Sequence, residues 1–126
     1  MITGIGIDAV YVKRMYAWLS KPSLMERFFH PEELSSALDR GDGAASSLAA
    51  RFAAKEAFGK ALGSGLRGIV LKDIMVKNKE NGQPEIVLFS TALKALNKNS
   101  ANKIHLSLTH EKDNAMAMVV LENVKT

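Results

Sequence analysis

The chain of 126 residues contains no cysteine, and this absence excludes several kinds of chemistry. Without thiols the protein has no disulfides, no thiolate metal site and no cysteine nucleophile. It also lacks any run of about 20 apolar residues, which a membrane-spanning helix requires. Residues 1–4 lack the charged start and the long apolar run of a signal peptide. We therefore expect a cytoplasmic protein with no membrane partner.

Aromatic residues make up only 6% of the chain, and this scarcity bears on its net charge of +4. A basic surface suits a nucleic acid, a phosphorylated cofactor or an acidic protein, or it serves solubility alone. A nucleic-acid-binding module would interleave aromatic and basic side chains on one face of a sheet. The strands expected here carry few aromatic residues, so we expect no nucleic-acid partner.

Proline, glycine and the spacing of apolar residues divide the chain into alternating elements. The pattern predicts strands at 2–10, 69–78, 85–89, 103–109 and 115–122. It predicts helices at 11–20, 22–29, 30–40, 44–62 and 90–99. The last four strands follow one another as two hairpins, the first of which turns at Asn81-Gly82. We therefore predict one domain over residues 1–126, of the α+β class, with a small antiparallel sheet and a long central helix.

Asp8 is the first candidate functional residue. Because strand side chains alternate, Asp8 shares a face with Gly4, Gly6 and Val10. A carboxylate beside two residues without side chains has open space in front of it, which a ligand or a counter-charge must fill. The alternative is structural: Asp8 caps the helix expected at 11–20, and the glycines serve backbone packing.

Glu56 is the second candidate, on the helix expected at 44–62. With about 100° of rotation per residue, its helix face carries mostly small and apolar residues together with Lys60; the face comprises Ala49, Phe52, Ala53, Gly59, Lys60 and Gly63. A buried carboxylate needs a partner, and Lys60 stands at the favourable i+4 position. The alternative to a functional role is a structural Glu56–Lys60 pair on a tightly packed helix.

Two carboxylates without a histidine or cysteine cluster form a hard-oxygen site, and Asp8 and Glu56 together therefore suggest Mg²⁺. This ion keeps several waters and takes phosphate oxygens as its remaining ligands. Arg51, Lys55 and Lys60 would supply positive charge for such a phosphate. The sequence contains neither a P-loop nor a complete dinucleotide-binding fingerprint.

Strand alternation also places His105, Ser107 and Thr109 on one face of the strand at 103–109. Three polar side chains in a row would line a phosphate or ribose pocket, or they would simply face water. Ser107 lacks the local pattern of a nucleophile elbow, which argues against a serine hydrolase.

Three blocks of the sequence, taken in order, resemble the holo-acyl-carrier-protein synthase family of short bacterial phosphopantetheinyl transferases. The first is Gly4–Asp8, followed closely by Arg14, and the second is Arg51–Gly65, with its Lys-Glu-Ala-Phe-Gly-Lys core. The third is His105–His110, leading to Ala115–Ala117. The hairpin turning at Asn-Gly also fits, so that the resemblance spans nearly the whole chain.

The resemblance implies an Mg²⁺-dependent enzyme that moves the 4′-phosphopantetheine arm of coenzyme A onto a serine of apo-acyl carrier protein, in support of fatty acid biosynthesis. Adenosine 3′,5′-bisphosphate would be the leaving group. Asp8 and Glu56 would be the magnesium ligands, and Glu56 and Lys60 the catalytic residues, with Lys60 on the diphosphate. Arg51 and His105 would hold the nucleotide phosphates of coenzyme A.

The same resemblance implies partners for the chain. Arg14 would meet the acidic carrier protein, and the short members form homotrimers with coenzyme A at each subunit interface. The stretch 40–47 departs from the expected pattern, because it offers few basic side chains for phosphate contacts. A catalytically idle domain of the same fold would have lost Asp8, Glu56 or Lys60, and all three are present.

Overall fold

The computed structural model describes residues 1–125, and it has the α+β architecture that the sequence predicts. Five strands and five α-helices occur within these residues, in an order close to the expected one. The strands are β1 (Ile2–Tyr11), β2 (Ile74–Asn78), β3 (Pro84–Leu88), β4 (Lys103–His110) and β5 (Asn114–Glu122). The helices are α1 (Val12–Leu19), α2 (Pro22–Phe28), α3 (Pro31–Leu38), α4 (Ala44–Leu62) and α5 (Ser90–Lys98).

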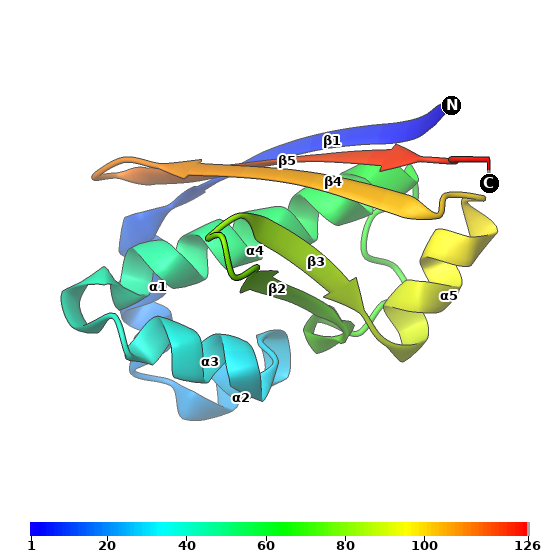
Figure 1. Cartoon of the computed structure of the whole chain (residues 1–126). Helices are drawn as coiled ribbons and strands as arrows, with labels where there is room; N and C mark the ends of the chain where they lie inside the picture. Colours follow the sequence, from blue (N-terminus) through cyan, green and yellow to red (C-terminus); the bar gives the residue numbers. More distant parts are fainter. Residues whose placement is uncertain (126) are drawn as a thin grey trace.

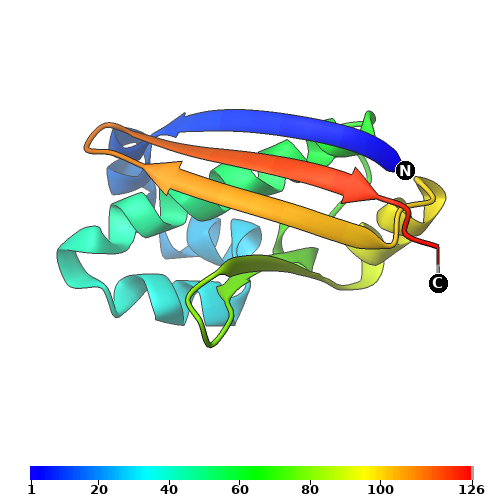
Figure 2. The ribbon, with the colours of Figure 1, turned by 45° about the horizontal axis from the view of Figure 1, so that its top comes forward.

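The long helix α4 packs against one face of a three-stranded antiparallel sheet with strand order β1-β5-β4 (Figures 1 and 2). Alanine at every fourth position of α4 allows this close approach, since Ala49, Ala53, Ala57 and Ala61 are all buried. The helix ends at Gly63, whose φ of 82° lies in the left-handed region that favours glycine. The inner face of the sheet and α4 thus form the centre of the hydrophobic core.

The strand pairing gives the three-stranded sheet one buried face and one exposed face. Val10 and its cross-strand partner Ala115 lie on the inner face and are buried. Ile7 and its partner Met118 lie on the outer face, and they are 63% and 40% exposed. The helices all lie on the inner side (Figure 1). The outer face therefore presents apolar side chains that no element of the described chain covers.

The second sheet differs from the expectation. The hairpin β2–β3 forms a two-stranded sheet of its own and does not pair with the other three strands. Its first strand begins at Ile74, because residues Leu71–Asp73 form a 3₁₀ turn. Asp73 is held there by the start of α5, whose Thr91 donates hydrogen bonds to Asp73 Oδ2 from both its backbone nitrogen and its hydroxyl.

Within residues 1–125, no helix combines the length and the apolar character needed to cross a membrane.

Candidate active site

The tight fit between β1 and α4 fixes the position of Asp8. A Cβ built on Gly4 would lie 1.8 Å from the Ala61 carbonyl oxygen, and one on Gly6 would lie 2.0 Å from that of Ala57. The glycines therefore allow the strand to lie directly on the helix backbone, and the expectation of open space beside Asp8 is wrong there. Asp8 itself follows this contact and is partly exposed.

Asp8 does not cap the first helix, contrary to the alternative drawn from the sequence. Helix α1 follows β1 without a loop, and Tyr11 is its N-cap residue without any side-chain capping bond. The carboxylate of Asp8 instead accepts a hydrogen bond from Lys60 Nζ, at 2.9 Å from its Oδ1. The lysine ammonium also donates to the Ile7 carbonyl oxygen at 3.0 Å.

Glu56 lies on the same helix one turn before Lys60 and is half-buried. Burial raises the pKa of its carboxyl above the ordinary value, and the negative charge of Asp8 raises it further. The positive charges of Lys60 and Arg14 act in the opposite direction on this pKa. The Glu56–Lys60 pair, which was the structural alternative drawn from the sequence, does not form within the described chain, since Lys60 pairs with Asp8 across the strand–helix contact.

Arg14 brings a second cation to the same place. Its guanidinium lies 5.0 Å from the centre of the Trp18 ring and 5.3 Å from that of Phe52. Cation–π contacts of this kind hold a guanidinium in a defined orientation on an otherwise exposed surface. The positive charge of Arg14 also lowers the pKa of Glu56, so this guanidinium on the first helix acts electrostatically on that carboxylate.

The resulting cluster contains two carboxylates and two cations at the edge of the three-stranded sheet. Within residues 1–125, no group of three histidine, cysteine or acidic side chains is placed to hold a metal ion. A metal bound by Asp8 and Glu56 would therefore need further ligands from outside the chain. Mg²⁺ suits such a site, because it is usually held by one or two carboxylates and completes its sphere with waters and phosphate oxygens. The charge of Asp8 raises the pKa of Glu56, which also fits a divalent cation between the two carboxylates.

Lys55 takes no part in this cluster, and the expectation that it supplies charge to a phosphate is wrong. Its side chain is fully buried and forms an ion pair of 2.7 Å with Glu33. It also donates to the backbone carbonyls of Leu71 and Ile74. Its role is structural, because these bonds join α4 to α3 and to the beginning of β2.

Arg51 lies in a separate cavity of about 220 Å³ on another side of α4. The cavity is lined by residues of the segment before α4, of α4 itself, of the second sheet and of β4: Arg40, Ser47, Ala50, Arg51, Val76, Asn78, Pro84, Leu108 and His110. Arg51 is only 6% exposed, and it donates to the hydroxyls of Ser47 and Ser36. Its Nε, however, finds no hydrogen-bond partner among the described residues.

This cavity has the properties of an anion site. Three of its lining side chains, Arg40, Arg51 and His110, are basic or titratable to a cation, and none is acidic. A buried guanidinium with an unsatisfied Nε favours an acceptor such as a phosphate oxygen. The sequence patterns did not identify Arg40 or His110 as site residues. For His110, a usable signal was strand alternation, which places it on the same inward face of its strand as Leu108.

His105 lies on the outer face of β4, as strand alternation predicts. Its Nε2 is 2.8 Å from Oε1 of Glu122 on the neighbouring strand, and this hydrogen bond lowers the pKa of the Glu122 carboxyl. Ser107 and Thr109 are exposed on the same face. Within one chain, His105 therefore lies near neither Asp8 nor the cavity of Arg51.

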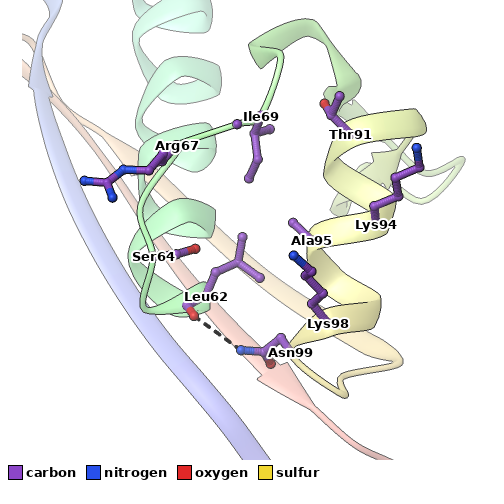
Figure 3. A pocket seen from close by; sticks show the side chains of 10 residues that line it. Leu62, Ser64, Arg67, Ile69, Thr91, Lys94, Ala95, Lys98 and Asn99 are labelled. Carbon is purple, nitrogen blue, oxygen red and sulfur yellow. Dashed lines mark hydrogen bonds between the residues drawn. The ribbon is translucent and has the colours of Figure 1, made fainter.

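A hollow of about 590 Å³ lies between the end of α4 and α5 (Figure 3). Its charged lining residues are Arg67, Lys94 and Lys98, and its apolar floor includes Leu62 and Ile69. No carboxylate lines it, so it is unsuited to a divalent cation. Binding of a divalent cation is therefore assigned to the cluster of Asp8, Glu56, Lys60 and Arg14.

Known proteins resemble this chain over nearly its whole length. The family model of the 4′-phosphopantetheinyl transferase superfamily matches residues 4–119. The holo-[acyl-carrier-protein] synthase of Treponema denticola is 59% identical over 122 residues, covering 97% of this chain and 99% of that protein. The synthase of Trichlorobacter lovleyi is 46% identical over 125 residues, covering 97% of this chain and 98% of that protein.

Solved structures of the same kind share the fold. The crystal structure of holo-[acyl-carrier-protein] synthase from Neisseria meningitidis matches with a TM-score of 0.88 and 36% identity, over 97% of this chain and 99% of the other. The synthase from Bacillus anthracis, in complex with CoA (3′,5′-ADP), matches with a TM-score of 0.81 and 36% identity, over 98% of this chain and 99% of the other.

Proposed function

Because the chain belongs to the 4′-phosphopantetheinyl transferase superfamily, we propose that it transfers the 4′-phosphopantetheine group of coenzyme A to a serine of apo-acyl carrier protein. Adenosine 3′,5′-bisphosphate is released, and the product supports fatty acid biosynthesis. The observation that carries the proposal is the cluster in which Asp8, Glu56, Lys60 and Arg14 converge. Displacement at phosphorus depends on positioning and charge neutralisation, which such a cluster supplies.

Asp8 and Glu56 are the proposed ligands of Mg²⁺, with the diphosphate of coenzyme A completing the coordination sphere. When bound, the ion would neutralise charge on the diphosphate during the displacement. The raised pKa of Glu56 supports this assignment, since the folded chain holds the two carboxylates where a cation is favoured.

Lys60 and Glu56 are the proposed catalytic residues. The side chain of Lys60 is 55% exposed, which leaves its ammonium free to turn from Asp8 toward a diphosphate oxygen and to stabilise the leaving group. Glu56 orients a water that accepts the serine proton, because a carboxylate already engaged with a cation is a poor base itself. The competing role is Glu56 as the direct base.

The variant Glu56→Gln separates these two roles. If Glu56 orients a water of the metal, the substitution lowers metal affinity and rate together. If Glu56 is the direct base, the rate falls and metal affinity stays unchanged. Metal affinity is measured by calorimetry with Mg²⁺ and coenzyme A, and rate by the release of adenosine 3′,5′-bisphosphate.

The nucleotide part of coenzyme A is proposed to bind Arg51 and His105 at the interface between two copies in a homotrimer. Within one chain these residues lie away from Asp8 and Glu56, so the site needs a second copy to bring them together. The uncovered apolar outer face of the sheet supports association, and the unsatisfied Nε of Arg51 supports a phosphate at its cavity.

The carrier protein is proposed to approach along the first helix. Its basic side chains, among them Lys13 and Arg14, are exposed, and carrier proteins are acidic. Long-range attraction of this kind accelerates encounter and weakens with salt. Because Arg14 lies beside Glu56, a carrier docked on it would present its serine close to the proposed metal ligands.

We propose that residues 1–126 form one transferase domain that acts in the cytoplasm. The test is incubation of the full chain with coenzyme A, Mg²⁺ and apo-acyl carrier protein, with release of adenosine 3′,5′-bisphosphate followed by chromatography. Release that stops with a chelator and with Asp8→Asn supports the proposal. Binding of coenzyme A without any release would indicate a catalytically idle domain.

A further inference from the structure

The ammonium of Lys60 lies at the position beside Asp8 that the proposed metal ion would occupy. Its ammonium lies 2.9 Å from a carboxylate oxygen of Asp8, a proposed metal ligand. The side chain of Asp8 is only 17% exposed, so little of the carboxylate remains open to a second cation. A positive charge on the chain itself therefore stands where the metal would bind.

A second bond fixes the lysine in this place. Lys60 Nζ also donates to the Ile7 carbonyl at 3.0 Å, and β1 is the edge strand of its sheet. Edge strands carry backbone groups without ladder partners, so this carbonyl is available to a side-chain donor. Two bonds to adjacent residues of β1 hold the ammonium against Asp8.

We infer that Lys60 is an internal counter-ion, which occupies the cation position at Asp8 in the metal-free enzyme and leaves it only when a diphosphate offers its ammonium a new partner. The inference rests on the proposed function, because it takes Asp8 as a metal ligand and coenzyme A as the source of the diphosphate. It adds a regulation of that site: beyond their direct contact, metal and coenzyme A strengthen each other's binding through one side chain.

The physical basis is competition between cations. A metal entering alone must displace Lys60 from Asp8, and it repels an ammonium that stays close to both proposed metal ligands. When the diphosphate is present, Lys60 moves to its oxygens, and Asp8 becomes free for the metal. By linkage, the factor by which coenzyme A tightens metal binding equals the factor by which metal tightens coenzyme A binding.

The test measures Mn²⁺ binding to the full chain, with free Mn²⁺ followed by electron paramagnetic resonance, with and without coenzyme A. In the absence of coenzyme A we expect Lys60→Met to bind Mn²⁺ about tenfold more tightly than the wild type, as expected for loss of one adjacent charge in a largely solvated setting. The enhancement by coenzyme A, large in the wild type, shrinks in the variant.

Two further variants separate the local charge of Lys60 from the net charge of the chain and from its stability. Lys94→Met removes the same charge from α5, outside the proposed site, and should bind Mn²⁺ as the wild type does. Lys60→Gln keeps a donor for the Ile7 carbonyl but removes the charge, so it should also tighten Mn²⁺ binding. A purely structural role for Lys60 would lower the melting temperature of both Lys60 variants and leave their Mn²⁺ affinity without coenzyme A unchanged.

The outcomes separate the inference from the proposed function. If the wild type binds Mn²⁺ with coenzyme A, and Lys60→Met shows unchanged or weaker binding without it, the inference is overturned and the proposed function stands. If the wild type binds no Mn²⁺ even with coenzyme A, or if Asp8→Asn binds it equally well, the proposed metal site is wrong and the inference falls with it.

Discussion

The folded chain disfavours the ionised form of Glu56, because burial removes water from its carboxylate and Asp8 repels it. Residues that bind a cation often have this property in the absence of the cation. The sequence indicated a buried carboxylate with a lysine partner at i+4. It could not indicate that the lysine would turn to Asp8, since that choice depends on how β1 crosses α4, 52 residues away in the sequence.

Glu56→Gln should therefore stabilise the metal-free protein. An acid whose pKa is raised by folding destabilises the folded state at every pH above its unfolded pKa, near 4.3. We expect the melting temperature of the variant to exceed that of the wild type by about 1–3 °C at pH 8 with a chelator present. The difference should vanish as the pH falls below about 4, where the carboxyl is protonated in both states. A lower melting temperature for the variant at pH 8 would contradict the account.

A second residue-scale result concerns Lys55, which the sequence grouped with the phosphate-binding cations. Its partner Glu33 accepts hydrogen bonds from the backbone nitrogens of His30 and Val76 as well as from Lys55. The sequence did not predict this buried pair, because its members lie 22 residues apart on different helices. In the structure Glu33 also takes part in the capping box of α3.

Lys55→Met should destabilise the protein by about 3–5 kcal/mol, since it leaves the Glu33 charge buried and unpaired. The double variant Glu33→Leu/Lys55→Met should lose less than the two single variants combined. Urea unfolding measures both quantities. The matched control is Lys72→Met, an exposed lysine near the same turn, which should change stability by less than about 0.5 kcal/mol. Equal losses of stability for Lys55→Met and Lys72→Met would contradict the structural role of Lys55.

At the scale of elements, the contact between β1 and α4 decides where the candidate site lies. The sequence predicted both elements, with α4 at its observed bounds of 44–62. It also predicted that Gly4, Gly6 and Asp8 share a face. It left open whether the glycines face a ligand or a backbone, because glycine is compatible with both. The structure answers that question, since the helix backbone itself fills the space.

Gly6→Ala should therefore displace the strand from the helix. Its Cβ would meet backbone atoms of α4, which cannot give way as a flexible side chain would. We expect a loss of about 3 kcal/mol in the free energy of unfolding, at the upper end for overpacking, with a loss of metal binding as Asp8 moves away from Glu56. Gly43→Ala is the control, since its Cβ would make only an ordinary contact of 3.5 Å. Similar stabilities for the two variants would contradict the packing argument.

At the scale of the whole molecule, the sheet is covered on one side only (Figure 1). The sequence predicted an antiparallel sheet but not its division into two, because strand pairing between distant segments leaves no local pattern in the sequence. The structure places Ile5, Ile7 and Met118 on the exposed outer face, but an apolar face alone does not say what covers it. In the proposed homotrimer, other copies of the chain cover it.

Met118→Glu should dissociate the proposed homotrimer, because it introduces a charge among apolar side chains on the outer face. Sedimentation should then show a single chain with wild-type secondary structure and greatly weakened binding of coenzyme A. Leu93→Glu, on the exposed side of α5, is the control and should leave the assembly intact. An unchanged sedimentation coefficient for Met118→Glu would show that this face is not the interface.

The proposed function has this chain place a phosphopantetheine group on a carrier serine through Asp8 and its neighbours. Its most direct test is the intact mass of apo-acyl carrier protein after incubation with the chain, coenzyme A and Mg²⁺, beside an Asp8→Ala control. The account predicts a gain of one phosphopantetheine group, abolished by a chelator and by the substitution. An unchanged carrier mass with a competent carrier, or the same gain with Asp8→Ala, would contradict it.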